Sequence, residues 1–412
     1  MKKLLMIFLT VFIALAATSC TNEDAKTKPP TEESTENPTE SVVPTPAPTR
    51  THTPTHTPTP EPFPGKIGIV TVVVDADEIE YFSAMKVIDK FGKKKINHTT
   101  WPVSFLSLEQ PIDLILRDEE VGAIILKSCN IGLDAAIKGR IENMNNIFTI
   151  CIRIDTINDN IEGITDQVDI ILQVDERGMG IPMARQAQKL GAKTFVHYSF
   201  PRHMEHKSLS DQRDLIRGEC ESLGLTFVDA MLPDPMIEVS AEDAQQFILE
   251  DVPKMIQKYG KDTAFFSTSC AVQISLINSV GVEGAIYPQP CHPSPYHGFS
   301  KALELPYDFL DPPSEEFLVS QIREALTKKG SLGKISTWPV DPSMLFTDSA
   351  AEYAAKWLNG EVPEEGIDIA VLTQLMTDYA GVQVYLTPYT DPETGITYDN
   401  YLMMRMDYIT FE

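Results

Sequence analysis

The chain has 412 residues, and its 34 Lys and Arg against 59 Asp and Glu give a formal net charge of -25 at pH 7. A field of this sign repels polyanions, so nucleic acid is excluded as an expected partner, whereas neutral and cationic ligands are compatible with it. The length leaves room for two domains of ordinary size with sizeable cores.

The N-terminus has the pattern of an export signal. Two lysines precede an apolar run from Leu4 to Ala17, which is shorter than the roughly 20 residues that a spanning helix needs. The tetrapeptide Ala17-Thr18-Ser19-Cys20 follows, and it resembles the lipobox of bacterial lipoproteins. This resemblance implies a signal peptide over residues 1–19, a lipid on Cys20 and an extracytoplasmic location at the cell membrane. An ordinary secretory signal with an incidental cysteine is the alternative.

Residues 20–65 are predicted to form a lipid-anchored, disordered tether rich in Pro and Thr. Thr-Pro and Thr-His-Thr-Pro units repeat between residues 43 and 60, and the segment lacks the apolar residues that a core requires. Proline keeps such a chain extended at about 3.1 Å per residue. His52 and His56 are interpreted as solvated tether residues rather than as a metal site.

Five further cysteines lie at positions 129, 151, 220, 270 and 291, with no CxxC pair and no regular spacing. No disulfide framework is predicted from an odd number with these spacings. Each lies in or beside an apolar segment, where cysteine behaves as a small buried hydrophobe.

From residue 66 onward, short β-branched runs alternate with amphipathic stretches, which predicts an α/β fold with parallel sheets. The first half has expected strands at 67–74, 96–101, 121–127, 147–154 and 168–174. The second half has expected strands at 194–199, 226–230, 263–267 and 284–287, and helices at about 181–190, 208–223, 241–259 and 271–280. Gly191, Gly224, Gly260 and Gly281 stand where those helices should stop.

The segment Val174-Asp175-Glu176-Arg177-Gly178-Met179-Gly180, continuing to Leu190-Gly191-Ala192-Lys193, resembles the crossover of type I periplasmic binding proteins. The segment Tyr353-Ala354-Ala355-Lys356-Trp357-Leu358-Asn359-Gly360 resembles a late helix of that family. The chain is thus identified as similar to a lipoprotein branch of this fold. The resemblance implies two doubly wound parallel-sheet lobes joined by a multi-strand hinge, with a ligand held between them.

The resemblance also implies three crossings between the lobes, expected near 173–175, after Gln289 and near Gly381. Lobe 1 is therefore expected to contain residues 66–174 and 291–380, and lobe 2 residues 175–290 and 381–412. The final segment is longer than the single returning strand that the comparison implies, and a turn is expected at 391–395.

Ligands of doubly wound sheets collect at the carboxyl ends of the strands, where loops and helix N-termini converge. In the first lobe this rule selects Asp75, Tyr81, Ser128, Asn130, Arg153 and Asp155. Asp155 also matches a position where the resembling family places a ligand-binding Asp. Asp77 is better explained as a helix cap.

In the second lobe the same rule selects Tyr198, Phe200, Arg202, Thr268, Ser269 and Gln289. Tyr198 and Phe200 could stack on a ring, and Arg202 could hold a carboxylate bidentately. The segment Tyr287-Pro288-Gln289-Pro290-Cys291-His292 departs from the family's Gly-Phe-Asp-like turn, and its prolines stiffen it.

These features predict a receptor that binds a small polar solute between two lobes, with a membrane permease as a possible partner and the N-terminal lipid as its contact with the membrane. The alternatives are a surface sensor or adhesion module on the same fold, and a Cys-dependent enzyme that uses Cys270 or Cys291 with His292 and His297. His203 and His206 have a spacing of three but lack clear partner ligands for zinc. No catalytic residue, metal or cofactor is predicted, and no P-loop, GxSxG or HExxH motif is present.

Overall fold

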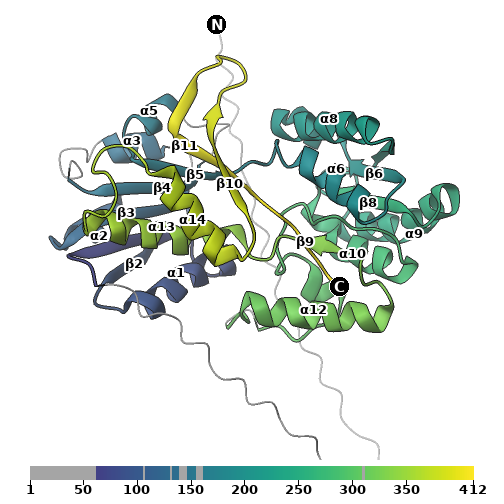
Figure 1. The fold of residues 1–412 in the computed structure, drawn as a ribbon, viewed down its shortest axis with the longest axis horizontal. Coiled ribbons are helices and arrows are strands. Elements are labelled where there is room, and N and C mark those ends of the chain that lie inside the picture. Colours follow the sequence, from purple (N-terminus) through teal and green to yellow (C-terminus); the bar gives the residue numbers. More distant parts are fainter. Residues whose placement is uncertain (1–61, 105–106, 130–131, 139–145, 155–160, 309–310) are drawn as a thin grey trace, which may run out of the picture. The chain divides into compact units, whose positions relative to one another are not determined.

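The computed structural model describes residues 62–104, 107–129, 132–138, 146–154, 161–308 and 311–412 (Figure 1). The predicted signal peptide, Cys20 and nearly all of the predicted tether lie outside the described residues, as do Asn130 and Asp155. Among the residues that are described, no helix has the length and apolar character needed to cross a membrane.

The first lobe contains a seven-stranded sheet with the order β10-β11-β5-β4-β3-β1-β2. Its strands are β1 (Lys66–Thr71), β2 (Ile96–Thr100), β3 (Val121–Cys129), β4 (Phe148–Ile154), β5 (Ile170–Val174), β10 (Val384–Thr390) and β11 (Thr397–Met406). All neighbours pair in parallel except β10 and β11, which are antiparallel. The order β2-β1-β3-β4-β5 is one of the two common doubly wound orders, with a switch point between β1 and β3.

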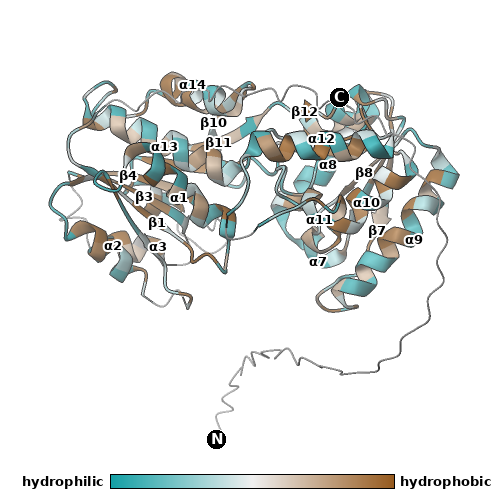
Figure 2. Ribbon diagram, turned by 90° about the horizontal axis from the view of Figure 1, so that it is seen from below, coloured by the Kyte–Doolittle hydropathy of each residue, from teal (hydrophilic) through white to brown (hydrophobic). Residues whose placement is uncertain are grey.

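Both faces of this sheet are buried, as a parallel sheet covered by helices requires. Ile69 and Ile125 face one core and Val70 and Ile124 face the other, because successive side chains of a strand point to opposite faces. The surrounding helices are α1 (Glu78–Phe91), α2 (Glu109–Leu116), α3 (Leu133–Lys138), α5 (Ile161–Thr165), α13 (Pro342–Leu358) and α14 (Ile369–Ala380). The inner strands are therefore near-continuous apolar runs, coloured mainly brown in Figure 2.

The second lobe has the strand order β7-β6-β8, with β6 (Thr194–Ser199), β7 (Thr226–Met231) and β8 (Thr263–Ser267) in parallel. Parallel bridges from Ala264 to Ile286 and from Tyr287 to Ile335 continue the sheet beyond β8. Beside them, β9 (Ser336–Thr337) pairs antiparallel with β12 (Ile409–Thr410). The second lobe thus repeats the order 2-1-3-4-5, and its switch point lies between β6 and β8.

Helices cover both faces of the second sheet as well. They are α6 (Gly180–Lys189), α7 (Pro201–Glu205), α8 (Lys207–Ser222), α9 (Ala241–Tyr259), η1 (Cys270–Val272), α10 (Gln273–Glu283), α11 (Phe299–Ala302) and α12 (Glu315–Lys329). Gly180 permits the close approach of α6 to α8, because a Cβ there would lie 2.6 Å from the backbone oxygen of Gln212. Gly191, Gly224 and Gly260 end helices with positive φ, as expected, but α10 runs through Gly281 and ends at Gly284 with φ 67°.

The first crossing between the lobes lies at 174–180, as expected, whereas the other two differ from expectation. Residues 299–329 were expected in lobe 1, but Phe299, Leu318 and Ile322 are buried in the core of lobe 2. The second crossing therefore follows β9 rather than Gln289. The amphipathic pattern of α12 predicts a buried stripe without specifying which sheet the stripe covers.

The assignment of residues 381–412 to lobe 2 is wrong for most of that segment. β11 pairs in parallel with β5 of the first lobe, and Leu402 and Met404 are buried in the first lobe's core. Only the end of the chain returns to lobe 2, where β12 pairs with β9 and Phe411 is fully buried. The third crossing thus lies at 406–409 rather than near Gly381. Figure 1 shows the long yellow strands against the first sheet.

Candidate functional site

A cavity of about 350 Å³ lies where the carboxyl ends of the first lobe's strands meet the loops of the second lobe. It is lined by residues 76–79, Arg153, Gln173, Val174, Glu176, Met179, Cys291, His292, Pro293, Tyr296, His297 and residues 341–343. The first-lobe positions lie at or just after the carboxyl ends of β1, β4 and β5 and at the start of α13, so the cavity occupies the place where doubly wound sheets bind ligands. We take it as the candidate site.

The first lobe's wall is organised by buried Glu80 at the start of α1. Its carboxylate accepts the backbone N–H of Val72 at 2.9 Å and the hydroxyl of Ser128, which joins the ends of β1 and β3. Asp77 caps α1 by accepting the N–H of Glu80 at 2.9 Å, as the sequence indicated. Arg153 reaches Asp77 with Nη1 at 3.4 Å, so it stands in the cavity wall beside these acids.

Arg153 of this wall and Ser128 on the neighbouring strand have strained backbones. Ser128 has φ 45° and Arg153 has φ 58°, a region that side chains other than glycine rarely adopt. They lie near the carboxyl ends of the neighbouring strands β3 and β4. Such strain persists only where the surrounding structure imposes it, and it concentrates at ligand-binding and active sites.

The remaining polar wall is mainly acidic. Asp341 caps α13 by accepting the N–H of Ser343 at 2.8 Å, and burial raises the pKa of its carboxyl group. Glu176, from the first crossing, is half-buried in the same wall. Asp77, Glu176 and Asp341 together outnumber the one arginine of the lining. The charge balance of the cavity therefore favours neutral or cationic ligands.

The wall that the second lobe contributes carries a cluster of sulfur and nitrogen atoms. The Sγ of Cys291 lies 3.3 Å from the Sγ of Cys270 and 3.3 Å from Nε2 of His297. Nδ1 of His292 lies 3.4 Å from both sulfurs. Hydrogen bonds from Cys291, and after it from His292 and His297, hold the pKa of the Cys270 thiol below its usual range.

Some predicted ligand residues of the second lobe contact other residues of that lobe instead of the cavity. Tyr198 is fully buried and donates to Asp251 at 2.8 Å, and Phe200 is buried in the same core. Arg202 forms a two-pronged ion pair with Asp234 at 2.8 and 2.9 Å, so its guanidinium already has a carboxylate partner. None of the three lines the cavity. The sequence placed them correctly at a strand end but could not show these long-range partners.

The other predicted positions either form hydrogen bonds inside the protein or lie outside the cavity. Thr268 forms hydrogen bonds with Ser199 and His203, both at 2.9 Å, and Ser269 is buried at the N-cap position of η1. Gln289 is fully buried and accepts the hydroxyl of Tyr408, which ties the second lobe to the third crossing. Asp75 is exposed, and Tyr81 packs edge-to-face on His98 with ring centroids 5.4 Å apart. Of the ten predicted ligand residues that the structure describes, only Arg153 lines the cavity, and Ser128 donates to Glu80 of the neighbouring helix α1.

Several residues of the site carried no usable sequence signal. Lys127 is fully buried, and its Nζ donates to the hydroxyls of Ser83 at 2.6 Å, Ser343 at 2.8 Å and Thr347 at 2.6 Å. Glu176 and Asp341 enter the wall from the first crossing and from a helix N-terminus. A lysine within a β-branched run and acids beside turns usually indicate solvent exposure, so these positions were missed.

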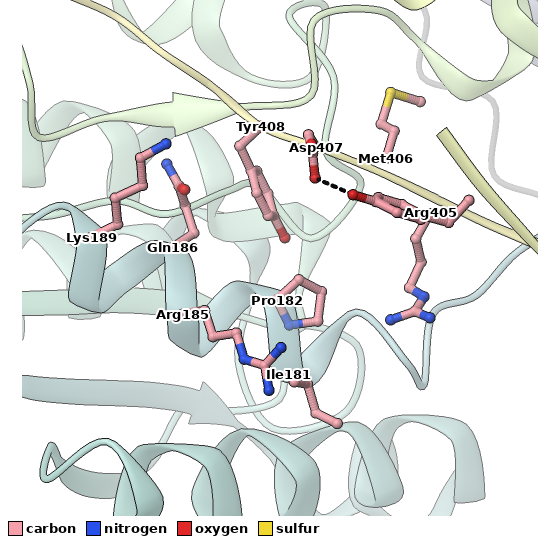
Figure 3. Close-up of a pocket in the computed structure, with 10 residues that line it drawn as sticks. Ile181, Pro182, Arg185, Gln186, Lys189, Arg405, Met406, Asp407 and Tyr408 are labelled. Atoms are coloured by element: carbon pink, nitrogen blue, oxygen red, sulfur yellow. Dashed lines mark hydrogen bonds between the residues drawn. The ribbon is translucent and has the colours of Figure 1, made fainter. Parts of the chain in front are cut away.

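Two other cavities lie beside the crossings. One, of about 560 Å³, is formed by α6, Tyr385 and residues 405–408 (Figure 3). Tyr385 donates a hydrogen bond to Asp407 at 3.3 Å. The other, of about 710 Å³, lies between the first crossing and the β10–β11 turn. Neither contains residues from the switch point of either sheet, and we do not consider them as the primary site.

The repeated strand order, the three crossings and the interlobe cavity define a type I periplasmic-binding-protein-like fold. A crystal structure of a putative transcriptional regulator from Clostridium difficile 630 has a TM-score of 0.77, with 21% identity, covering 85% of this chain and all of that one. At this identity the likeness shows the fold alone. A sugar ABC transporter structure from Actinomyces odontolyticus matches more distantly, with a TM-score of 0.46, 9% identity and coverage of 72% of this chain and 84% of that one.

A family model described as "Protein of unknown function (DUF3798)" matches residues 65–336, and the chain belongs to this family. An uncharacterized protein of Treponema pallidum (strain Nichols) is 36% identical over 120 residues, which are 29% of this chain and 56% of that protein. A second uncharacterized protein of the same strain is 28% identical over 148 residues, which are 34% of this chain and 64% of that protein. The chain thus spans less than two thirds of the length of each of these relatives.

Proposed function

We propose that the protein is an extracytoplasmic, lipid-anchored receptor that binds a small polar solute between its two lobes and delivers it to a membrane permease. The observation that carries this proposal is the interlobe cavity at the carboxyl ends of β1, β4 and β5, with Arg153 set among acidic side chains. Cavities of a few hundred Å³ with a few convergent polar groups are typical of small-ligand sites.

The charges of the lining indicate the kind of solute. Arg153 offers hydrogen-bond donors to an oxygen of the solute, and Glu176 and Asp341 offer acceptors or counter-charges. A solute with hydroxyl or amino groups satisfies both, whereas a dianion would meet repulsion from the acids. We therefore propose a neutral or cationic polar solute.

The three crossings supply the mechanism of binding. Segments 174–180, 337–342 and 406–409 join the lobes, and closure around them would enclose the solute by rotation of one lobe against the other. The N-terminal tether and the lipid on Cys20 would keep this body near its permease at the membrane surface. Solute binding requires no bond chemistry in this scheme.

Native mass spectrometry of the purified protein, followed by a thermal-shift screen of sugars, amino acids, nucleosides and quaternary amines, tests the proposal. A bound solute should raise the melting temperature by mass action. Glu176→Gln should weaken the binding of a cationic solute by roughly tenfold or more, since a charge-assisted hydrogen bond is lost. Glu221→Gln, an exposed site at the end of α8, is the matched control and should bind as the wild type does.

The receptor proposal fails if the protein carries no co-purified solute and no compound of these classes shifts its melting temperature. It also fails if an identified solute binds to Glu176→Gln and to Arg153→Ala as tightly as to the control Glu221→Gln. The solute would then occupy another site.

A further inference from the structure

Four potential metal ligands converge on the second lobe's side of the cavity. Their ligand atoms, the Sγ of Cys270 and Cys291, Nδ1 of His292 and Nε2 of His297, all lie within 4.8 Å of one another. Cys270 begins η1 directly after β8, and the other three lie on the proline-rich segment that follows Tyr287. The fold thus brings together residues that are 21 positions apart in the chain.

We infer that this cluster binds a thiophilic divalent cation, for which Zn²⁺ is the best fit. Two cysteine sulfurs and two imidazole nitrogens form the Cys₂His₂ donor set of tetrahedral zinc sites. Soft sulfur ligands select against Mg²⁺ and Ca²⁺, which prefer oxygen. The inference goes beyond the proposed receptor function, because it does not require a solute in the cavity.

The spacing of the four atoms fits a tetrahedral ion. With Zn–S near 2.3 Å and Zn–N near 2.0 Å, a regular tetrahedron has roughly 3.8 Å between its sulfurs and roughly 3.5 Å between a sulfur and a nitrogen. The observed distances are 3.3 Å between the sulfurs and 3.3 to 3.4 Å for the three close sulfur–nitrogen pairs. The remaining pairs lie within 4.8 Å, so small movements of the side chains would complete the coordination.

A buried glutamine, Gln273, forms hydrogen bonds to both chain segments that carry the cluster. Nε2 of Gln273 donates to the backbone oxygens of Ser267 and Ser269 at 3.0 and 2.8 Å, which fixes the turn that carries Cys270. Its Oε1 accepts the N–H of Cys291 at 3.4 Å and the hydroxyl of Tyr287. Supporting contacts of this kind orient the ligands of metal sites. The cluster is thus preorganised by a residue that is only 1% exposed.

The cluster is also accessible to an ion. The side chains of Cys270 and His292 are exposed, and Cys291, His292 and His297 line the cavity. The competing arrangement is a disulfide, but both cysteines are free and their sulfurs lie 3.3 Å apart, beyond the roughly 2.05 Å of an S–S bond. On binding, the cation would displace the thiol protons of the two cysteines into solvent.

The full-length protein, purified under reducing conditions without chelator, should contain one zinc per chain by plasma mass spectrometry. The metal-free protein should bind Zn²⁺ in competition with a chromophoric chelator, and Co²⁺ should give the intense visible bands of tetrahedral sulfur coordination. Cys270→Ser/Cys291→Ser should weaken Zn²⁺ binding at least 100-fold and abolish the Co²⁺ bands. Cys220→Ala, which removes a buried cysteine outside the cluster, should leave both unchanged.

A measurement on the wild-type chain keeps the test valid even if the cysteine variants fail to fold. Zn²⁺ should protect two thiols from alkylation, identified by peptide mapping as Cys270 and Cys291. The inference is overturned if no metal binds with defined stoichiometry, if the double variant retains wild-type affinity, or if mapping finds Cys270 joined to Cys291 under native conditions. Failure of the solute screen would not affect these results, because they are measured without solute.

Discussion

Lys127 shows how much of the first lobe's wall depends on one buried charge. Burial lowers the pKa of its ammonium group from 10.5 to about 8, and the nearby charges of Glu80, Asp77 and Asp341 oppose that shift. A buried lysine held mainly by neutral partners destabilises the fold when it is protonated. It therefore gives the protein a pH-dependent component of stability.

We predict that the stability of the wild type rises relative to that of Lys127→Met as the pH increases from about 7.5 to about 10. The folded-state pKa is lower than the unfolded value, so between these two values the unfolded chain binds more protons and stability increases with pH. The change should be about 2 kcal/mol. Urea denaturation of both proteins at several pH values measures it, and parallel pH profiles would show that Lys127 is not the group responsible.

At the scale of residues, the sequence predicted local roles such as helix capping more reliably than it predicted long-range contacts. Asp77 was predicted as a helix cap and is one, because capping depends on neighbours within three residues. Arg202 was predicted to face a ligand but is paired with Asp234, which is 32 positions away. Cys270, Cys291, His292 and His297 entered only as an alternative enzyme site, and the fold shows that they form one cluster. The helix cap could therefore be predicted from neighbouring residues, whereas the residues that form the site are determined by contacts between distant parts of the chain.

At the scale of elements, hydrophobic periodicity predicted the strands β1 to β8 and the helices α6, α8, α9 and α10. It did not predict which of the two sheets each late helix or strand packs on, because an apolar stripe specifies that a face is buried but not which surface covers it. β10 and β11 extend the first lobe's sheet at the edge of β5, and α12 covers the second lobe. In both cases the decisive factor is which sheet has an open edge or face, and that depends on the rest of the chain.

The placement of β11 leads to a prediction about stability. Leu402 is fully buried in the first lobe's core and pairs with Leu172 of β5. Leu402→Ala should destabilise the protein by about 2 to 5 kcal/mol, because it removes buried methyl groups and leaves a cavity. Ile396, in the turn before β11, is 49% exposed, and Ile396→Ala should change stability by less than about 0.5 kcal/mol.

Urea unfolding of the two variants, together with hydrogen exchange of β5, distinguishes them. Leu402→Ala should speed exchange in β5 of the first lobe, since its neighbouring strand is loosened. If exchange increases only in the second lobe, the tail belongs there in solution and the observed pairing of β11 is wrong.

At the scale of the whole molecule, the lobes are joined by contacts outside the crossings. Glu315 at the start of α12 accepts the ammonium of Lys86 from α1 at 2.9 Å and the hydroxyl of Tyr379 from α14 at 3.2 Å. Ile79 of α1 also packs in the core of the second lobe. The sequence predicted two lobes, but it could not reveal this latch of Lys86, Glu315 and Tyr379, because Glu315 lies 229 positions from Lys86 and 64 from Tyr379. A rotation that separated the lobes on this side would break these contacts.

We predict that Glu315→Gln shifts the protein toward an open state. The neutral amide keeps the size of the side chain but loses the ion pair with Lys86, which is partly buried and stabilises the closed arrangement by about 1 kcal/mol. The ratio of open to closed molecules should then rise roughly fivefold. Small-angle X-ray scattering of residues 62–412 should show a larger radius of gyration for this variant than for the wild type. Glu316→Gln changes the neighbouring, exposed carboxylate of the same helix and should scatter as the wild type does. Equal radii for all three proteins would show that the hinge segments, rather than the latch, set the distance between the lobes.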